Sequence, residues 1–234
     1  KNDAERDVVI RSIGPHWDGN EVWLITAGGA MFASFPMWYA TLFSGYYLVL
    51  FCILAALIFR GVSFEFRANM ETQRWRTFWE WAGTIGSFCA AFLFGMLFTS
   101  MIKGMPIDKN GDMTAHFFDY VNLFSIVGGV AIVVLCLVHG LNFIRLKTTG
   151  ELRERALSWN KVLYPVLFAG EVVFAILLFF FTDFFSKKPM TTTAIIVALV
   201  VFTCLAYWGV LKNHEWLSFI GSGLGLISVV VLIF

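Results

Sequence analysis

Residues 192–211 read TTAIIVALVVFTCLAYWGVL and contain no Asp, Glu, Lys or Arg. About 20 apolar residues of α-helix span the hydrocarbon core of a bilayer, and a lone strand there would leave its backbone groups unpaired. The run therefore predicts a transmembrane helix. Six further stretches of the 234-residue chain have the same character, at about residues 14–35, 37–59, 79–102, 120–144, 159–181 and 216–234.

The composition agrees with a chain that lies largely in lipid. Hydrophobic residues make up 59% of it and charged residues only 14%, whereas a soluble domain carries about a quarter charged residues. The balance of 17 basic and 16 acidic residues argues against a nucleic-acid partner. We predict an all-α, polytopic membrane helix bundle with about seven transmembrane helices, forming a single domain over residues 1–234.

The basic residues predict the orientation of this bundle. If the predicted spans alternate in direction, thirteen Lys and Arg residues lie on one side of the membrane and four on the other. Basic residues accumulate on the cytoplasmic side, so the chain is expected to begin in the cytoplasm. The thirteen are Lys1, Arg6, Arg11, Arg60, Arg67, Arg74, Arg76, Arg145, Lys147, Arg153, Arg155, Lys161 and Lys212, and the four are Lys103, Lys109, Lys187 and Lys188.

Two carboxylates lie near the start of the first predicted span. An ionisable residue inside a membrane costs roughly 2.5 to 3.5 kcal/mol, which makes it a candidate for function. Asp18 and Glu21 are three residues apart and share a helix face. If Gly14 caps the helix and Pro15 is its first residue, both acids complement the helix dipole by about 0.3 to 1 kcal/mol. A proton-conducting role and a structural role both fit.

Glu171 lies near the middle of the fifth predicted span and cannot act as a helix cap. It is expected to face the bundle or a partner, either protonated or hydrogen-bonded. A buried carboxylate relay for protons and a structural carboxylic acid remain open. Glu171 also supports an alternative function, in which the chain is a secondary transporter or channel that uses this residue as its coupling site.

The histidines and cysteines favour no metal or haem site in this chain. His139 is the one histidine with a long apolar stretch around it, but it lies close to the end of its span without a second histidine at matching depth. Haem ligation by His139 is therefore a third, less favoured interpretation. The four cysteines fall in separate apolar runs, as small buried hydrophobic residues do.

Residues 13–30 read IGPHWDGNEVWLITAGGA, and residues 60–67 read RGVSFEFR. Together with shorter matches between them, these stretches closely resemble subunit II of the cytochrome bd ubiquinol or menaquinol oxidases. Beyond residue 67 the chain resembles this family in its pattern of spans. The family's subunit II has nine spans and an external N-terminus, so one helix before Lys1 and one after Phe234 are expected outside this sequence.

This resemblance implies the non-haem subunit of a terminal quinol:oxygen oxidoreductase in a bacterial or archaeal cytoplasmic (inner) membrane. Subunit I would bind haems b and d, react with quinol and form a heterodimer with this chain. Small single-helix subunits and membrane lipid are further partners that the family allows. The chain itself is expected to be non-catalytic and to bind no cofactor directly, although a bound quinone is compatible with the resemblance.

The resemblance also implies roles for residues at the start of the first span. Asp18 corresponds to the acid that lines a proton path from the cytoplasm, between the two subunits, towards the oxygen-reducing haem. Glu21 accompanies it on this path, and no family role corresponds to Glu171. The supporting neighbours of Asp18 are His16, Trp17 and Asn20.

Overall fold

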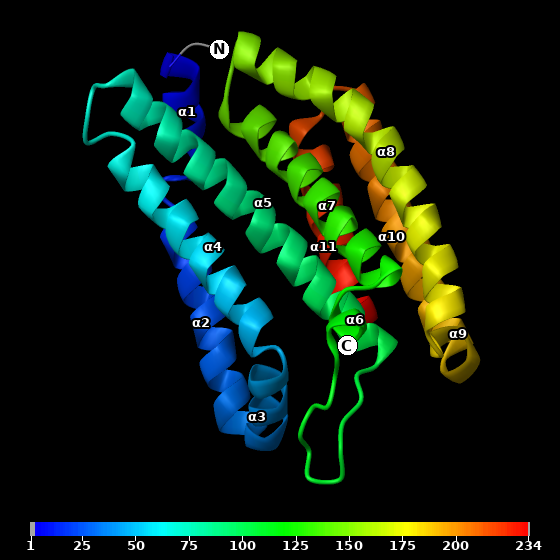
Figure 1. Ribbon diagram of the computed structural model, residues 1–234. Helices are drawn as coiled ribbons and strands as arrows, with labels where there is room; N and C mark the ends of the chain where they lie inside the picture. The colour runs from blue at the N-terminus through cyan, green and yellow to red at the C-terminus, as the bar shows by residue number, and fades with distance from the viewer. Residues whose placement is uncertain (1–2, 234) are drawn as a thin grey trace.

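The computed structural model describes residues 3–233, and these form a bundle of long α-helices (Figure 1). Within that range the only β-type pairing is an isolated bridge between Ile107 and Met113. The helices are α1 (Asp3–Ile13), α2 (Trp17–Ser34), α3 (Pro36–Gly45), α4 (Tyr47–Phe66), α5 (Gln73–Lys103), α6 (Phe117–Tyr120), α7 (Leu123–Lys147), α8 (Glu151–Phe181), α9 (Phe184–Lys187), α10 (Pro189–Leu211) and α11 (Glu215–Ile233).

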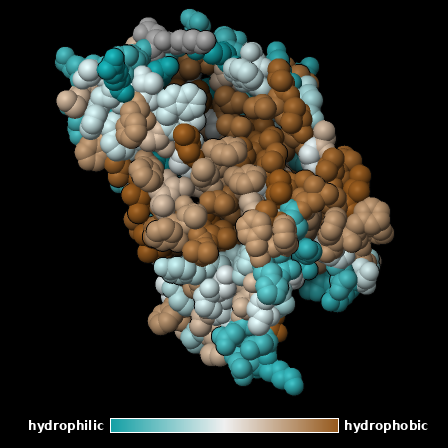
Figure 2. All heavy atoms as spheres, in the orientation of Figure 1, coloured by the Kyte–Doolittle hydropathy of each residue, from teal (hydrophilic) through white to brown (hydrophobic). Residues whose placement is uncertain are grey.

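Among residues 3–233, six helices are long and apolar enough to cross a membrane, namely α4, α5, α7, α8, α10 and α11. The last five of them overlap the last five predicted spans. Figure 2 shows hydrophobic side chains across the middle of the molecule and hydrophilic ones towards its two ends. The prediction of an all-α, polytopic membrane bundle is therefore confirmed.

The first two predicted spans differ from the observed helices. The helix α2 covers most of residues 14–35. Polar residues in its first two turns lower its mean hydropathy, so it does not count among the six helices that are apolar enough to cross a membrane. The predicted span 37–59 is interrupted, because α3 ends at Gly45 and α4 begins at Tyr47. The Tyr120 hydroxyl donates a hydrogen bond to the Gly45 carbonyl at 2.7 Å, so a distant segment binds the chain at this break.

Glycines allow close contact between several pairs of helices, as their small size permits. A Cβ atom on Gly95 of α5 would lie 2.6 Å from the carbonyl oxygen of Gly128 and 2.7 Å from the Cα of Gly129, both in α7. A Cβ on Gly221 of α11 would lie 2.9 Å from the backbone nitrogen of Ala206 in α10. Gly128, Gly129 and Gly221 therefore lie where neighbouring helices approach closely.

Gly28 and Gly29 of α2 make no such contact among the described residues. A Cβ atom on either residue would have no described neighbour within 4 Å. Gly223 and Gly225 make ordinary van der Waals contacts, with nearest atoms at 3.6 and 3.7 Å. No described residue therefore packs closely against Gly28 and Gly29 of α2.

Basic residues gather at one end of the bundle, which we call the basic end. There α4, α7 and α10 finish, α5, α8 and α11 begin, and α1 lies nearby (Figure 1). Lys1 lies outside the described residues, and the other twelve of the thirteen predicted cytoplasmic Lys and Arg residues belong to segments at or near this end. The opposite end carries the loop around Asn110 and the short helix α9. That the basic end faces the cytoplasm stays a prediction.

Candidate functional site

The motif around Asp18 forms the start of α2. The expected cap was wrong, because the Gly14 N–H donates to the Ile10 carbonyl at 3.0 Å and thereby ends α1. The helix α2 begins at Trp17, with His16 as its N-cap residue. Asp18 nevertheless lies in the first turn, where its negative charge complements the helix dipole.

Asp18 is exposed and makes only a local contact that the structure describes. Its Oδ1 accepts a hydrogen bond from the backbone N–H of the next residue, Gly19, at 2.8 Å. His16 and Asn20, the predicted supporting residues, are also exposed. These side chains share the start of α2 but do not form a closed site, so Asp18 is accessible to water or to a partner.

Glu21 is held differently from Asp18. The Arg60 Nη1 of α4 donates to the Glu21 Oε1 at 2.5 Å, and these side chains are 25% and 26% exposed. The Arg60 guanidinium also lies 5.2 Å above the centre of the Phe64 ring, a cation–π arrangement. Sequence reasoning did not connect Arg60 with this site. The one available signal was its place in the family-like stretch 60–67.

Trp17 contacts the same part of α4. Its ring meets the Phe64 ring edge-on, with 5.4 Å between centroids. A Cβ atom on Gly61 would lie 3.1 Å from the Trp17 Cζ3, so the glycine leaves room for the indole. We call Trp17, Glu21, Arg60, Gly61 and Phe64 the α2–α4 contact cluster.

Ion pairs attach α1 to the ends of α4 and α5. Arg67, which is 6% exposed, donates to Asp7 of α1 and, through Nε at 3.0 Å, to Glu80 of α5. Burial opposes the charge of Arg67, but hydrogen bonds to these two acids outweigh it and raise the pKa of the guanidinium. Arg6 of α1 pairs with Glu80 as well. One buried arginine thus joins three helices.

A further ion pair joins α1 to α8. The guanidinium of Arg155 donates from Nη1 and Nη2 to the two carboxylate oxygens of Glu5, at 3.1 and 2.9 Å. These hydrogen bonds lower the pKa of Glu5. The helix α1 is therefore bound on both sides, to α4 and α5 and to α8.

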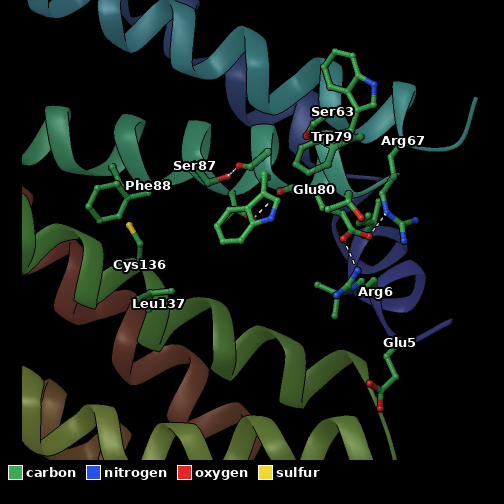
Figure 3. Close-up of a pocket in the computed structure, with 18 of the residues that line it drawn as sticks. Glu5, Arg6, Ser63, Arg67, Trp79, Glu80, Ser87, Phe88, Cys136 and Leu137 are labelled. Carbon is green, nitrogen blue, oxygen red and sulfur yellow. Dashed lines mark hydrogen bonds and ion pairs between the residues drawn. The ribbon is translucent and has the colours of Figure 1, made fainter. Parts of the chain in front are cut away.

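A cavity of about 1050 Å³ lies beneath α1 and is lined by residues of α1, α4, α5, α7 and α8. Figure 3 shows the ion pairs of Arg6 and Arg67 with Glu80 on one side of it, and Phe88 and Leu137 on another. Its walls are mostly apolar, with charged groups near the basic end. The cavity does not include Asp18 or Glu21.

Glu171 lies far along the chain from this motif and bonds to a neighbouring helix. The Thr203 Oγ1 of α10 donates to the Glu171 Oε1 at 2.7 Å. The Oε2 atom is buried without a hydrogen-bond partner among the described residues, beside an apolar cavity of about 140 Å³. Of the alternatives expected for Glu171, the structure shows a carboxyl group that is hydrogen-bonded to a helix of the bundle, while its role stays a prediction.

The His139 side chain packs against α11. Its Nδ1 lies 2.9 Å from the Ser222 Oγ, and its ring stacks on Phe219 with 4.7 Å between centroids. The same serine accepts a hydrogen bond from Asn142, which also donates to the Tyr164 hydroxyl. This arrangement favours a structural role for His139 over the haem-ligand interpretation.

Comparison with known proteins supports the resemblance on which the Asp18 prediction depends. The family model described as cytochrome bd terminal oxidase subunit II matches residues 1–234. Cytochrome bd ubiquinol oxidase subunit 2 of Bacillus subtilis is 42% identical over 233 residues, which cover 100% of this chain and 69% of that protein.

Two further relatives match a shorter part of the chain. Cytochrome bd-I ubiquinol oxidase subunit 2 of Escherichia coli K12 is 43% identical over 166 residues, which cover 69% of this chain and 44% of that protein. A probable cytochrome oxidase subunit 2 of Haemophilus influenzae is 41% identical over the same length, with the same coverage. With the motif at residues 13–30 and the membrane helices of the bundle, these matches show that the chain belongs to the cytochrome bd terminal oxidase subunit II family.

Proposed function

We propose that this chain is the haem-free subunit of a terminal quinol:oxygen oxidoreductase in a bacterial or archaeal cytoplasmic membrane. It pairs with a haem-bearing subunit I, which binds haems b and d and oxidises quinol. It contributes a proton path from the cytoplasm for the reduction of dioxygen to water. The family match over residues 1–234 carries this proposal, and the relatives' names specify ubiquinol oxidases.

Asp18 is the acid that we place at the entrance of the proton path. Reducing oxygen to water consumes protons, so an oxidase buried in lipid needs groups that bring protons in from one side. Asp18 is exposed in the first turn of α2, near the basic end. A carboxylate there can accept a proton from water and release it to a neighbouring acceptor. Glu21 lies one turn further along, and His16, Trp17 and Asn20 flank the entrance.

The exposed surface of α2 supports pairing with another subunit. Trp23 and Ile25 are each 74% exposed, and a Cβ atom on Gly28 or Gly29 would meet no described neighbour within 4 Å. Small residues on a membrane helix allow another helix to approach closely. We propose that subunit I covers this surface, so that the path from Asp18 runs between the two subunits. Lipid and small single-helix subunits would cover other exposed faces.

Purification of the complex tests the subunit assignment. A haem-containing subunit is expected to co-purify with this chain from membranes, and the complex is expected to oxidise quinol with oxygen. The isolated chain is expected to show no Soret absorption band. A stoichiometric Soret band on the isolated chain would contradict the haem-free assignment and favour His139 as a haem ligand.

Substitution of Asp18 tests the proton path. In an assembled complex with full haem content, Asp18→Asn is expected to lower oxygen consumption at saturating quinol by about 10²- to 10⁴-fold, the usual contribution of a positioned acid or base. Asp183→Asn, an exposed acid at the opposite end, is the matched control. Normal turnover of Asp18→Asn would remove this residue from the path.

Glu171 supports a second candidate function. Its unpaired Oε2 atom beside an apolar cavity is compatible with a buried carboxyl relay in the oxidase, or with the coupling site of a secondary transporter or channel. Reconstitution of the chain alone in liposomes separates these roles. Ion or proton transport that Glu171→Gln abolishes would favour the transporter. Reduced turnover of the Glu171→Gln complex without such transport would favour the relay.

A further inference from the structure

The stretch RGVSFEFR at residues 60–67 has no assigned role, although it contributes three of the five residues of the α2–α4 contact cluster. Arg60, Gly61 and Phe64 of this stretch each contact a residue in the first two turns of α2. Beyond these turns, the side chains of α2 are largely exposed. The position of the α2 start relative to the bundle therefore depends on this small set of contacts.

The Arg60–Glu21 contact is the polar part of the cluster. At 2.5 Å it is a short, charge-assisted hydrogen bond between two side chains that are each about three-quarters buried. The guanidinium cannot lose its proton in a protein, so it always presents a positive charge to Glu21. Removing either partner would leave the other charge unpaired in a partly dry environment. The Glu21 carboxylate is thus held in an ion pair with Arg60.

The apolar part of the cluster fixes the same face of α2. Trp17 and Glu21 are four residues apart and lie one above the other on the helix. Trp17 fits against Gly61 and Phe64, while Arg60 bonds Glu21 and lies over Phe64. Two residues of α2, one turn apart, are therefore held against one face of α4.

Holding these two residues sets the direction of Asp18. Successive residues of an α-helix are rotated by about 100° around the axis. Asp18 is therefore rotated by about 100° from Trp17 and by about 60° from Glu21, which places it at the edge of the face that contacts α4. This agrees with its exposure and with its single local hydrogen bond to Gly19. The two acids of the motif consequently lie in different environments.

We propose that Arg60 is a positioning residue of the proton entrance. It binds Glu21 as a fixed ion pair, sets the rotation of α2, and so directs Asp18 towards the surface that another subunit would cover. Asp18 then exchanges protons, whereas Glu21 acts as the anchor of α2. This inference rests on the proposed function of Asp18 and adds a division of labour between the two acids.

The test uses the complete oxidase complex purified from membranes, with haem content measured for each variant. The variants are Arg60→Gln, Glu21→Gln, the double variant of both, and Arg60→Lys. Glu65→Gln and Arg74→Gln, two exposed residues at the same end, are the matched controls. Oxygen consumption is measured from low to high pH, with kcat and the KM for quinol determined separately.

Arg60→Gln is expected to lower kcat roughly tenfold or more, because small misplacements of a reacting group have large effects on rate. The KM for quinol should stay unchanged, and the pH profile of kcat should shift, which loss of stability alone would not cause. Glu21→Gln is expected to resemble Arg60→Gln. The double variant, whose two amides can bond to each other, should be several-fold faster than either single variant. Arg60→Lys should recover part of the loss.

Two results would overturn the proposal. An assembled Arg60→Gln complex with the kcat and pH profile of the controls would show that Arg60 positions nothing. A double variant as slow as Glu21→Gln would show that Glu21 carries protons itself. If the Arg60→Gln complex does not assemble, the kcat and pH profile of the double variant are compared with those of Glu21→Gln, and those of Arg60→Lys with those of the controls. Failure of the Asp18 proposal would give a different result. The Asp18→Asn complex would then turn over normally, whether or not the effects of substituting residues 21 and 60 are coupled.

Discussion

At the scale of single residues, Asn142 shows how a polar side chain is accommodated inside the bundle. It is fully buried in α7, donates to the Tyr164 hydroxyl at 2.9 Å and to the Ser218 carbonyl at 3.1 Å, and accepts from Asn160 at 2.7 Å. Its partners come from α8 and α11. A buried polar group costs little when it is hydrogen-bonded and much when it is not. Asn142 therefore specifies how three helices meet.

Replacing Asn142 with leucine is expected to destabilise the protein by about 1–3 kcal/mol, because Asn160 and Tyr164 lose a buried partner. The measurement is reversible unfolding in mixed detergent micelles. Leu137→Ala, at an exposed position of the same helix, is the control and should have a much smaller effect. An Asn142→Leu protein as stable as this control would show that the network contributes nothing to stability.

At the scale of elements, α1 is the helix whose attachment depends most on charge. It bonds to α4 and α5 through Arg67 and Glu80, and to α8 through Arg155. The pKa of Glu5 is lowered by its hydrogen bonds to Arg155, so this contact stabilises the folded protein above the unfolded Glu pKa of about 4.3. Its contribution is lost as the pH falls through the lowered pKa.

A spin label on Val8→Cys is expected to become more mobile as the pH falls through the lowered pKa of Glu5, because protonation releases Arg155. High salt should have a similar effect by screening the exposed pairs. Glu5→Gln should make the label more mobile already at neutral pH. Glu151→Gln removes an acid that also contacts Arg155 but lies outside α1, and it should leave the label unaffected. Equal mobility in all variants would contradict this account of α1.

The crossing of α5 and α7 is a close backbone approach that substitution of a glycine can test. Gly95→Ala would place a Cβ atom 2.6 Å from the Gly128 carbonyl oxygen, so the helices must separate. Overpacking of this kind costs about 1–3 kcal/mol. Gly170→Ala in α8, where a Cβ meets nothing within 4 Å, is expected to be neutral or slightly stabilising. Equal unfolding free energies for the two variants would show that this crossing is not tightly packed.

At the scale of the whole molecule, the arrangement of charge predicts its orientation in the membrane. Asn69 lies between α4 and α5 at the basic end, and Asn110 lies in the exposed loop at the other end. A membrane-impermeant maleimide is expected to label Asn110→Cys from outside the cell and Asn69→Cys only in inverted vesicles. The unsubstituted protein, whose four cysteines all lie in spanning helices, is the control. Labelling with the opposite sidedness would reverse the orientation and remove Asp18 from the cytoplasmic side.

The predicted spans show where sequence reasoning succeeds and where it fails. The charge-free run 192–211 lies within α10, because a long apolar stretch can satisfy its backbone in lipid only as a helix. The run 37–59 is also free of charged residues, but the chain breaks at Tyr46, whose buried hydroxyl lies 2.8 Å from the Ser100 Oγ of α5. A break held by a contact with a distant helix leaves little trace in local hydropathy.

The sequence by itself determined the helical membrane class, the grouping of charges at one end and the family-like motif around Asp18, because each depends on residues close together in the chain. Only the tertiary structure decided which acid is held and which is exposed. Glu21 pairs with Arg60, which is 39 residues away in the sequence, and Gly61 leaves room for Trp17. Both contacts require α2 and α4 to pack in one particular rotation about their axes. Hydropathy and spacing do not specify that rotation, because it results from side chains of two helices fitting together.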